Sequence, residues 1–132
     1  MKVVITYCSG PKRKDGGLLP AVDRYLSRRI RTLYQEATAS AVEFRILSGE
    51  FGLVAADQPI PWYDHLLSVE EIGELTEKVA AGLTGLRADT VEYHTADPAL
   101  FPDVAPYQEV IEAACRVVGM NLEIFLLFGD PD

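Results

Sequence analysis

The order of the apolar segments along the chain constrains its fold more than any other feature. Short runs rich in β-branched and aromatic residues, which are typical of buried strands, alternate with longer segments whose apolar residues recur every three or four positions, which is typical of helices. The predicted strands span residues 2–7, 42–47, 89–95 and 122–128. Because strands and helices alternate, the pattern predicts an α/β fold in three layers, with a mostly parallel four-stranded sheet between helices.

Each segment between two predicted strands carries the signals of a helix. The first helix starts at Pro20, which is tolerated in the first turn of a helix. Its apolar residues follow helical spacing and are Val22, Leu26, Ile30, Leu33 and Ala37. Ser68 and Glu71 form a predicted capping box for the second helix. The third helix covers residues 104–118, and Gly119 is expected to end it.

Length and composition indicate one globular unit. The chain has 132 residues, of which 48% are hydrophobic and 24% are charged. These values suit one packed core and leave no room for a second domain of ordinary size. We therefore expect a single α/β domain over residues 1–128 and a frayed tail over residues 129–132.

The same composition argues against several classes of protein. No apolar run approaches the roughly 18–20 residues that span a bilayer, and no cleavage site of small residues follows the start, so we expect neither a membrane partner nor a signal peptide. The two cysteines, Cys8 and Cys115, are too few for a disulfide framework, and with two distant histidines they show no zinc-binding spacing. We expect a cytoplasmic protein with no metal ion and no cofactor, and the sequence leaves its oligomeric state open.

Charge is distributed unevenly along the chain. The net charge is −8, yet residues 1–31 hold eight basic and two acidic residues, whereas the remaining residues hold four basic and eighteen acidic ones. An acidic protein is poorly suited to coating nucleic acid non-specifically. The local excess of basic residues is compatible with a pocket for one phosphate group, and also with a solvated helix face that carries Arg24, Arg28 and Arg31.

The loop after the first strand is an expected place for a ligand, because open parallel sheets bind ligands at the carboxyl ends of their strands. Ser9 and a glycine precede Lys12 and Lys14 in this loop, and exposed backbone N–H groups together with cations suit a phosphate. The spacing matches neither the Walker loop nor the dinucleotide fingerprint, so a plain glycine turn is the alternative. Cys8 stands where either a nucleophile or a small buried cysteine would fit, and Cys115 is expected in the core.

The loop after the second strand and the segment beyond it carry groups that suit a sugar or a planar ring. Ser48 and Glu50 follow the strand, and the carboxylate could act as a general base, contact a hydroxyl group or stay solvated. Trp62 and Tyr63 could stack on a ring or form a small core under the loop, and Asp64 could pair with ring N–H groups.

Two histidines are weaker candidates for catalysis. His65 adjoins Asp64, but neighbouring residues in a chain rarely face each other, and His94 stands near the end of the third strand. We therefore give neither histidine a role in the predicted site.

Several short motifs in the first half of the chain match motifs that occur together in one family. The matching residues, in order, are Cys8-Ser9, Lys12 or Lys14, Pro20-Ala21, Tyr25 with Ser27, Leu47-Ser48, Gly52-Leu53, Pro61 and Tyr63-Asp64. In order and spacing, over roughly residues 3–67, they resemble a family of small bacterial and archaeal domains of unknown function. That family is described as similar to the peroxide-stress protein YaaA and to uracil-DNA-glycosylase-like domains associated with tRNA-guanine transglycosylases.

The resemblance implies a Rossmann-like α/β domain and a nucleotide or nucleobase ligand, with no established reaction. Cys8, Tyr25 and Gly49 join the predicted ligand-binding residues on this ground. Gly49 and Glu50 stand where the family usually has Ala and Lys. The exchange of an ammonium group for a carboxylate favours contact with a base or a hydroxyl group over contact with an anion.

The leading prediction is a nucleotide or nucleobase-like ligand at the strand ends. Ser9, Lys12 and Lys14 are expected to hold its phosphate. The residues expected to contact its sugar or ring are Ser48, Glu50, Tyr63 and Asp64. Hydrolysis of an N-glycosidic bond, with Glu50 or Asp64 directing a water molecule, is a further hypothesis.

The alternative prediction is a non-catalytic interaction module. It would dock an acidic partner or a nucleic-acid backbone through the basic first helix. The direction of the lysines separates the two predictions: Lys12 and Lys14 turned toward the second loop favour the ligand site, and lysines that fan outward with the helix arginines favour the module.

Overall fold

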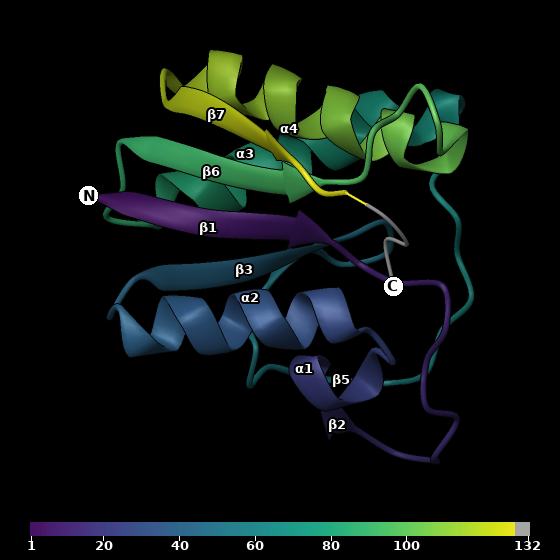
Figure 1. The fold of residues 1–132 in the computed structure, drawn as a ribbon. Helices are drawn as coiled ribbons and strands as arrows, with labels where there is room; N and C mark the ends of the chain where they lie inside the picture. The colour runs from purple at the N-terminus through teal and green to yellow at the C-terminus, as the bar shows by residue number, and fades with distance from the viewer. Residues whose placement is uncertain (129–132) are drawn as a thin grey trace.

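The computed structural model describes residues 1–128 and shows a five-stranded, mostly parallel sheet with helices on both of its faces (Figure 1). Its strands are β1 (Lys2–Tyr7), β3 (Glu43–Ser48), β4 (Gly52–Val54), β6 (Thr90–Thr95) and β7 (Asn121–Leu126). They lie in the order β4-β3-β1-β6-β7, and every neighbouring pair is parallel except β3 with β4. The predicted α/β class is confirmed.

The prediction of four strands is wrong by one. The chain turns back at Gly52, whose φ of 78° suits a residue without a side chain. The three residues of β4 then pair antiparallel with the end of β3, so that Ser48 lies opposite Gly52. What the sequence predicted as a long loop therefore begins with a hairpin that closes one edge of the sheet.

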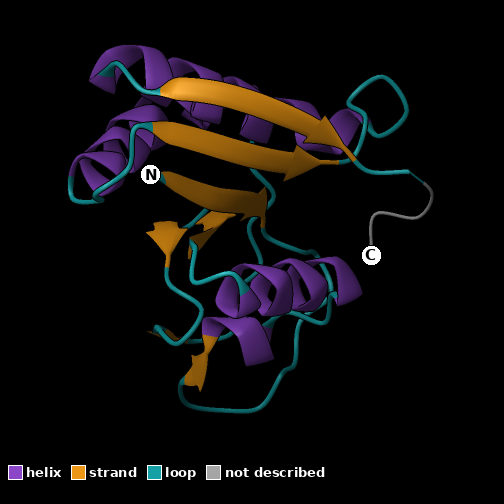
Figure 2. Cartoon of the chain, turned by 60° about the vertical axis from the view of Figure 1, so that its left-hand side comes forward, coloured by secondary structure: helices purple, strands orange, loops and turns teal. Residues whose placement is uncertain are grey.

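The helices cover the two faces of the sheet unequally. They are α1 (Ala21–Arg24), α2 (Arg28–Ala39), α3 (Ile72–Thr84) and α4 (Ala105–Val118), with single helical turns η1 (Val69–Glu71) and η2 (Pro102–Val104) before the last two. Figure 2 shows α3 and α4 packed side by side on one face and α2 with the short α1 on the other. The capping box of Ser68 and Glu71 and the end of α4 at Gly119 are confirmed.

The single first helix that the sequence predicted is in fact two helices. Residues 25–27 are extended between α1 and α2, and the hydroxyl group of Ser27 accepts a hydrogen bond of 3.1 Å from the Ile30 N–H, which starts α2. Leu26, expected on the buried stripe, is 54% exposed, whereas Arg24, expected on the solvated face, is 0% exposed. The break rotates the two helices relative to each other, so the periodicity of one helix does not predict burial in both.

A small second sheet connects the segment that follows β1 with the segment that follows β4. β2 (Leu19–Pro20) pairs antiparallel with β5 (Pro59–Ile60). Backbone hydrogen bonds from Ala21 and Val22 to the carbonyl groups of Gln58 and Ala56 extend this contact. The loops after β1 and after β3, far apart in the sequence, are thereby held beside each other.

No helix among residues 1–128 is long and apolar enough to span a bilayer. The predicted tail, residues 129–132, lies outside the described residues.

Candidate functional site

The strand order defines a crevice between the carboxyl ends of β1 and β6. The connection from β1 to β3 carries α2 on one face, and the connections on the other side of β1 carry α3 and α4 on the opposite face (Figures 1 and 2). Such a change of direction between neighbouring parallel strands leaves room for a ligand. A cavity of about 450 Å³ lies at this point. Its lining residues are Tyr7, Cys8, Ser9, Gly10, Lys12, Asp64, His65, Leu66, Leu100, Phe101, Pro102, Asp103, Val104 and Tyr107.

The loop after β1 presents free backbone donors and one cation to the crevice. The Ser9 hydroxyl group donates to the Pro11 carbonyl at 2.7 Å and fixes the turn. Among the described residues, no hydrogen-bond acceptor meets the amide N–H of Ser9 or of Gly10. A Cβ atom at Gly10 would contact nothing within 4 Å, so its backbone is open. The Lys12 ammonium group, 3.2 Å from the Gly10 carbonyl, completes a positive wall.

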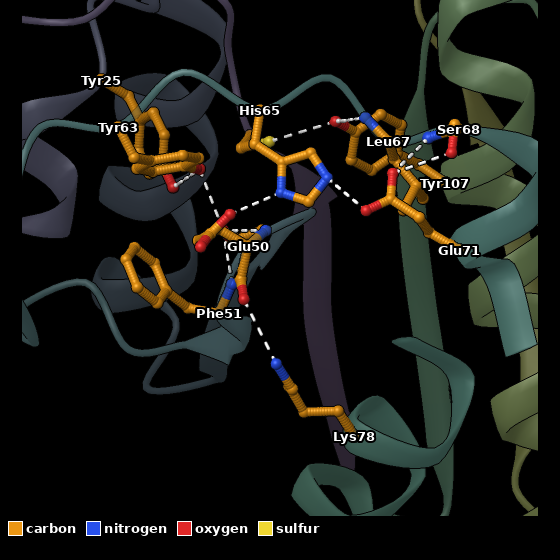
Figure 3. Close-up of polar contacts among 12 residues, drawn as sticks. Tyr25, Glu50, Phe51, Tyr63, His65, Leu67, Ser68, Glu71, Lys78 and Tyr107 are labelled. Atoms are coloured by element: carbon orange, nitrogen blue, oxygen red, sulfur yellow. Dashed lines mark hydrogen bonds and ion pairs between the residues drawn. The ribbon is translucent and has the colours of Figure 1, made fainter. Parts of the chain in front are cut away.

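His65 forms part of the opposite wall and is held by two carboxylates (Figure 3). Its Nδ1 lies 2.5 Å from Oε2 of Glu50, and its Nε2 lies 2.6 Å from Oε2 of Glu71. The hydrogen bond with Glu50, reinforced by Glu71, raises the pKa of His65. The amide and hydroxyl groups of Ser68 donate to Glu71 and lower its pKa. The imidazolium is therefore favoured, and it donates from both ring nitrogens.

Glu50, a predicted catalytic residue, does not line the crevice. Its carboxylate faces a separate hollow of about 180 Å³, shared with Glu71, Glu74 and Lys78. The Lys78 ammonium group donates to the Glu50 carbonyl at 3.3 Å. Glu50 therefore acts on the crevice indirectly, through its hydrogen bond with His65, which lines the crevice. Asp64, the other predicted catalytic residue, lines the crevice directly.

Ser48, Tyr63 and Tyr25 form a chain of buried hydroxyl groups beneath the loops (Figure 3). The Tyr63 hydroxyl group lies 2.6 Å from that of Tyr25 and 2.9 Å from that of Ser48, which also accepts from the N–H groups of Glu50 and Phe51. Burial raises the pKa of both tyrosines, so both stay neutral. None of the three predicted residues lines the crevice; their hydroxyl groups join the loops that shape it.

Gly49 and Cys8 meet at Tyr107, the residue of α4 nearest the crevice. A Cβ atom at Gly49 would lie 3.1 Å from the Tyr107 hydroxyl oxygen, so the glycine permits close packing of the turn. The same oxygen accepts from the Cys8 thiol at 3.8 Å and from the Leu67 N–H at 3.2 Å. Cys8 lines the crevice as predicted, whereas Cys115 is buried in the core, and burial raises its pKa to about 11.

The third wall of the crevice comes from the segment after β6. Its lining residues lie at 100–104, and the sequence analysis named none of them as a candidate. His94 instead stacks on Phe125 of the neighbouring strand with ring centroids 4.9 Å apart, and burial lowers its pKa. Pro98 and Pro102, which follow the third predicted strand and are typical of a loop, were the available signal for this wall.

Of the three arginines predicted on a basic face of the first helix, Arg24 does not lie there. Arg24 is fully buried and donates to the backbone carbonyl groups of residues 13, 15, 17 and 60 at 2.8–3.2 Å. Arg28 and Arg31 are exposed, and Arg31 pairs with Asp23 at 3.0 Å. Lys12 and Lys14 turn toward residues 62–63, with their ammonium groups 4.4 Å from the Tyr63 ring centroid and 5.9 Å from the Trp62 ring centroid. The ligand prediction expected them to converge on the loop at Ser48, and it stays a prediction.

Comparisons of the chain with family models, with curated proteins and with solved structures each return no match. The resemblance of residues 3–67 to a family of uncharacterised domains therefore stays a prediction.

Proposed function

We propose that the protein binds a nucleotide or a nucleobase-like ligand in the crevice at the carboxyl ends of β1 and β6. The observation that carries this proposal is the convergence of the loop after β1, the segment around Asp64 and the segment 100–104 on one cavity of about 450 Å³. Ligand sites commonly have volumes of about 300–1,000 Å³ and an apolar lining with few polar groups, and this cavity fits that description.

The wall formed by the loop after β1 suits a phosphate group. The amide N–H groups of Ser9 and Gly10, which meet no acceptor among residues 1–128, would supply neutral donors, and Lys12 would supply a positive charge. Adjacent backbone donors combined with one ammonium group are a common arrangement for an anion. Gly10 allows a phosphate to approach the backbone closely because no side chain intervenes.

The other walls suit a planar ring and its polar edge. Phe101 and Tyr107 offer aromatic surface, and Asp64 offers a carboxylate acceptor for ring or amino N–H groups. The acidic wall and the basic wall lie on different loops, so one ligand with a phosphate and a hydrogen-bond-donating ring can satisfy both.

Hydrolysis of an N-glycosidic bond is the reaction that this arrangement supports best. Asp64 would take a proton from water as the water oxygen bonds to the anomeric carbon. The bonding electron pair would leave with the base nitrogen, which would then take up the proton from Asp64. Glu50 and Glu71 would act only by orienting His65 beside this water. Within residues 1–128 no three acidic, histidine or cysteine side chains are arranged to hold a metal ion.

We further propose that the architecture is a three-layer Rossmann-like fold, because its four parallel strands lie in the sequence order 2-1-3-4 with helices on both faces. A cytoplasmic location stays a prediction. The interaction module also stays a prediction: Arg24 of its docking face is buried, whereas Arg28 and Arg31 are exposed.

Calorimetric titration with the nucleoside 5′-monophosphates, and with the matching nucleosides, tests the proposal. We expect heat of binding for at least one monophosphate and about tenfold weaker binding for Lys12→Gln, because one charge-assisted contact is lost. Arg87→Gln removes an exposed charge at the opposite end of the sheet and should bind like the native protein. Folded protein that releases no heat with any monophosphate would refute the proposal.

A further inference from the structure

A second hollow adjoins the crevice and has a different lining. Its volume is about 300 Å³, and it lies between the loop after β1 and residues 62–64. Gly10, Lys12 and Asp64 line both the hollow and the crevice. These three residues therefore form the boundary that the two spaces have in common.

The hollow combines exposed aromatic surface with positive charge. Trp62 is 44% exposed although it is a large apolar residue, and it shares the hollow with the exposed Leu26. The Lys14 ammonium group lies 5.9 Å from the Trp62 ring centroid, and that of Lys12 lies 4.4 Å from the Tyr63 ring centroid. Aromatic faces beside cations are the arrangement that binds successive bases and their linking phosphates.

The number of available cations limits how much phosphate the site can neutralise. Most of the other basic residues in the first 31 positions are already engaged. Three of them form ion pairs, which are Lys2 with Glu92, Arg13 with Asp15 and Arg31 with Asp23. Two more, Arg24 and Arg29, lie in the interior. Lys12 and Lys14 alone face the hollow. With the rest of the chain strongly acidic, the site suits about two phosphate groups and not a long polyanion.

Building on the proposed nucleotide site, we propose that the crevice and the hollow together bind two linked nucleotide units. The first unit occupies the crevice. The linking phosphate lies at Lys12, where the two spaces meet, and the ring of the second unit stacks on Trp62 with its phosphate near Lys14. The shared chemistry is a phosphodiester-linked pair of nucleotides, either as a free dinucleotide or as part of a single strand.

Fluorescence of Trp62, the single tryptophan of the chain, reports directly on the hollow. We expect the dinucleotides pTpT and pApA to change this fluorescence, and at least one of them to bind about tenfold or more tightly than its own mononucleotide, because base stacking adds to the affinity. With two phosphates neutralised, the logarithm of the affinity should fall with the logarithm of salt concentration with a slope of about −1.4.

Two variants separate stacking from general damage. By calorimetry, Trp62→Ala should lower dinucleotide affinity about tenfold toward that of the mononucleotide and leave mononucleotide affinity unchanged, whereas Trp62→Phe should keep most of the gain. Lys14→Gln should weaken dinucleotide binding only, and Arg87→Gln should weaken neither. Cooperative thermal unfolding confirms that each variant is folded.

The outcomes distinguish this inference from the proposed function. If mononucleotides bind but dinucleotides bind no more tightly and leave the fluorescence of Trp62 unchanged, the inference is overturned and the proposed function stands. If no nucleotide binds, both fail. Titration with the octamer of thymidylate then identifies the source: an octamer that binds with the affinity of pTpT for each pair of adjacent units indicates a single strand, and an octamer that binds more weakly indicates a free dinucleotide, and either result supports a site for two units.

Discussion

The first 31 residues contain two kinds of basic residue that look alike in the sequence and have opposite environments in the fold. Arg24 is fully buried and donates from its two terminal nitrogens to four backbone carbonyl groups, while its Nε meets no acceptor among the described residues; Arg29 is buried and donates to the carbonyl groups at the end of β1. Lys12 is half-buried and Lys14 exposed, and their ammonium groups lie over two aromatic rings, those of Tyr63 and Trp62, that line the hollow beside the crevice.

The difference follows from the two side chains. A guanidinium group is planar, carries five donors and is weakly hydrated, so it can satisfy several carbonyl groups of an irregular loop at once. An ammonium group is compact and strongly hydrated, and it keeps free donors for a ligand. The buried arginines therefore hold the loop after β1 in shape, and the lysines give that loop its charge.

The largest effect should come from removing an arginine of the first kind. Arg24→Ala leaves four carbonyl groups without a donor, and we expect a loss of about 3–5 kcal/mol in the free energy of unfolding measured with urea. Arg28→Ala, at an exposed position of α2, should change it by less than about 0.5 kcal/mol. Equal effects of the two variants would contradict the division into structural and free cations.

This division marks where sequence analysis succeeded and where it failed. Regular elements were predictable, since β1 matches its prediction residue for residue and α4 ends at Gly119. The burial of Arg24 was not predictable, because its partners are backbone carbonyl groups, which have no sequence signature. The apolar spacing of Val22, Leu26 and Ile30 continues through the break between α1 and α2 and so concealed it.

Removing the lysines should lower the affinity for a ligand and leave the free energy of unfolding almost unchanged, whereas removing Arg24 should lower the stability. The double variant Lys12→Gln/Lys14→Gln should unfold within about 0.5 kcal/mol of the native protein, because neither side chain makes an ion pair in the described structure. Its affinity for a nucleoside monophosphate should fall by about tenfold or more. Urea unfolding and calorimetry on the same samples provide the comparison, and a loss of stability without a loss of affinity would reverse the assignment.

An intermediate effect is expected at the hydroxyl chain beneath the site. Tyr63→Phe removes hydrogen bonds to Tyr25 and Ser48 inside the protein, and we expect a loss of about 1–2 kcal/mol in the free energy of unfolding. Tyr34→Phe is the matched control, because the Tyr34 hydroxyl group bonds to no other described residue. A loss near zero at Tyr63 would mean that this chain does not hold the loops together.

The smallest effect concerns the two histidines, whose pKa values shift in opposite directions. The raised pKa of His65 contributes stability that is complete below its ordinary value of about 6.5 and is lost as the pH rises through the raised value. The lowered pKa of His94 contributes stability that is complete above about 6.5 and is lost as the pH falls. NMR titration of the ring protons should show a higher pKa for His65 than for His94. The opposite order would contradict the hydrogen bonds that hold His65 between Glu50 and Glu71, which we call the carboxylate clamp.

The clamp also shows why the candidate site was only partly predictable. Cys8, Ser9, Lys12 and Asp64 line the crevice as expected from their places after the strands. His65 was set aside because it adjoins Asp64, yet its partners are Glu50 and Glu71, which come from other elements. The capping box fixed the position of Glu71 in the sequence, but only the fold reveals that its second oxygen faces His65.

Mapping of amide chemical shifts during titration with a nucleoside monophosphate tests the central claim most directly. The account predicts saturable shifts at Ser9, Gly10, Asp64 and Phe101, which line the crevice from three separate segments, with little change along α2. Shifts concentrated on α2 around Arg28, or an unchanged spectrum at millimolar nucleotide, would contradict it.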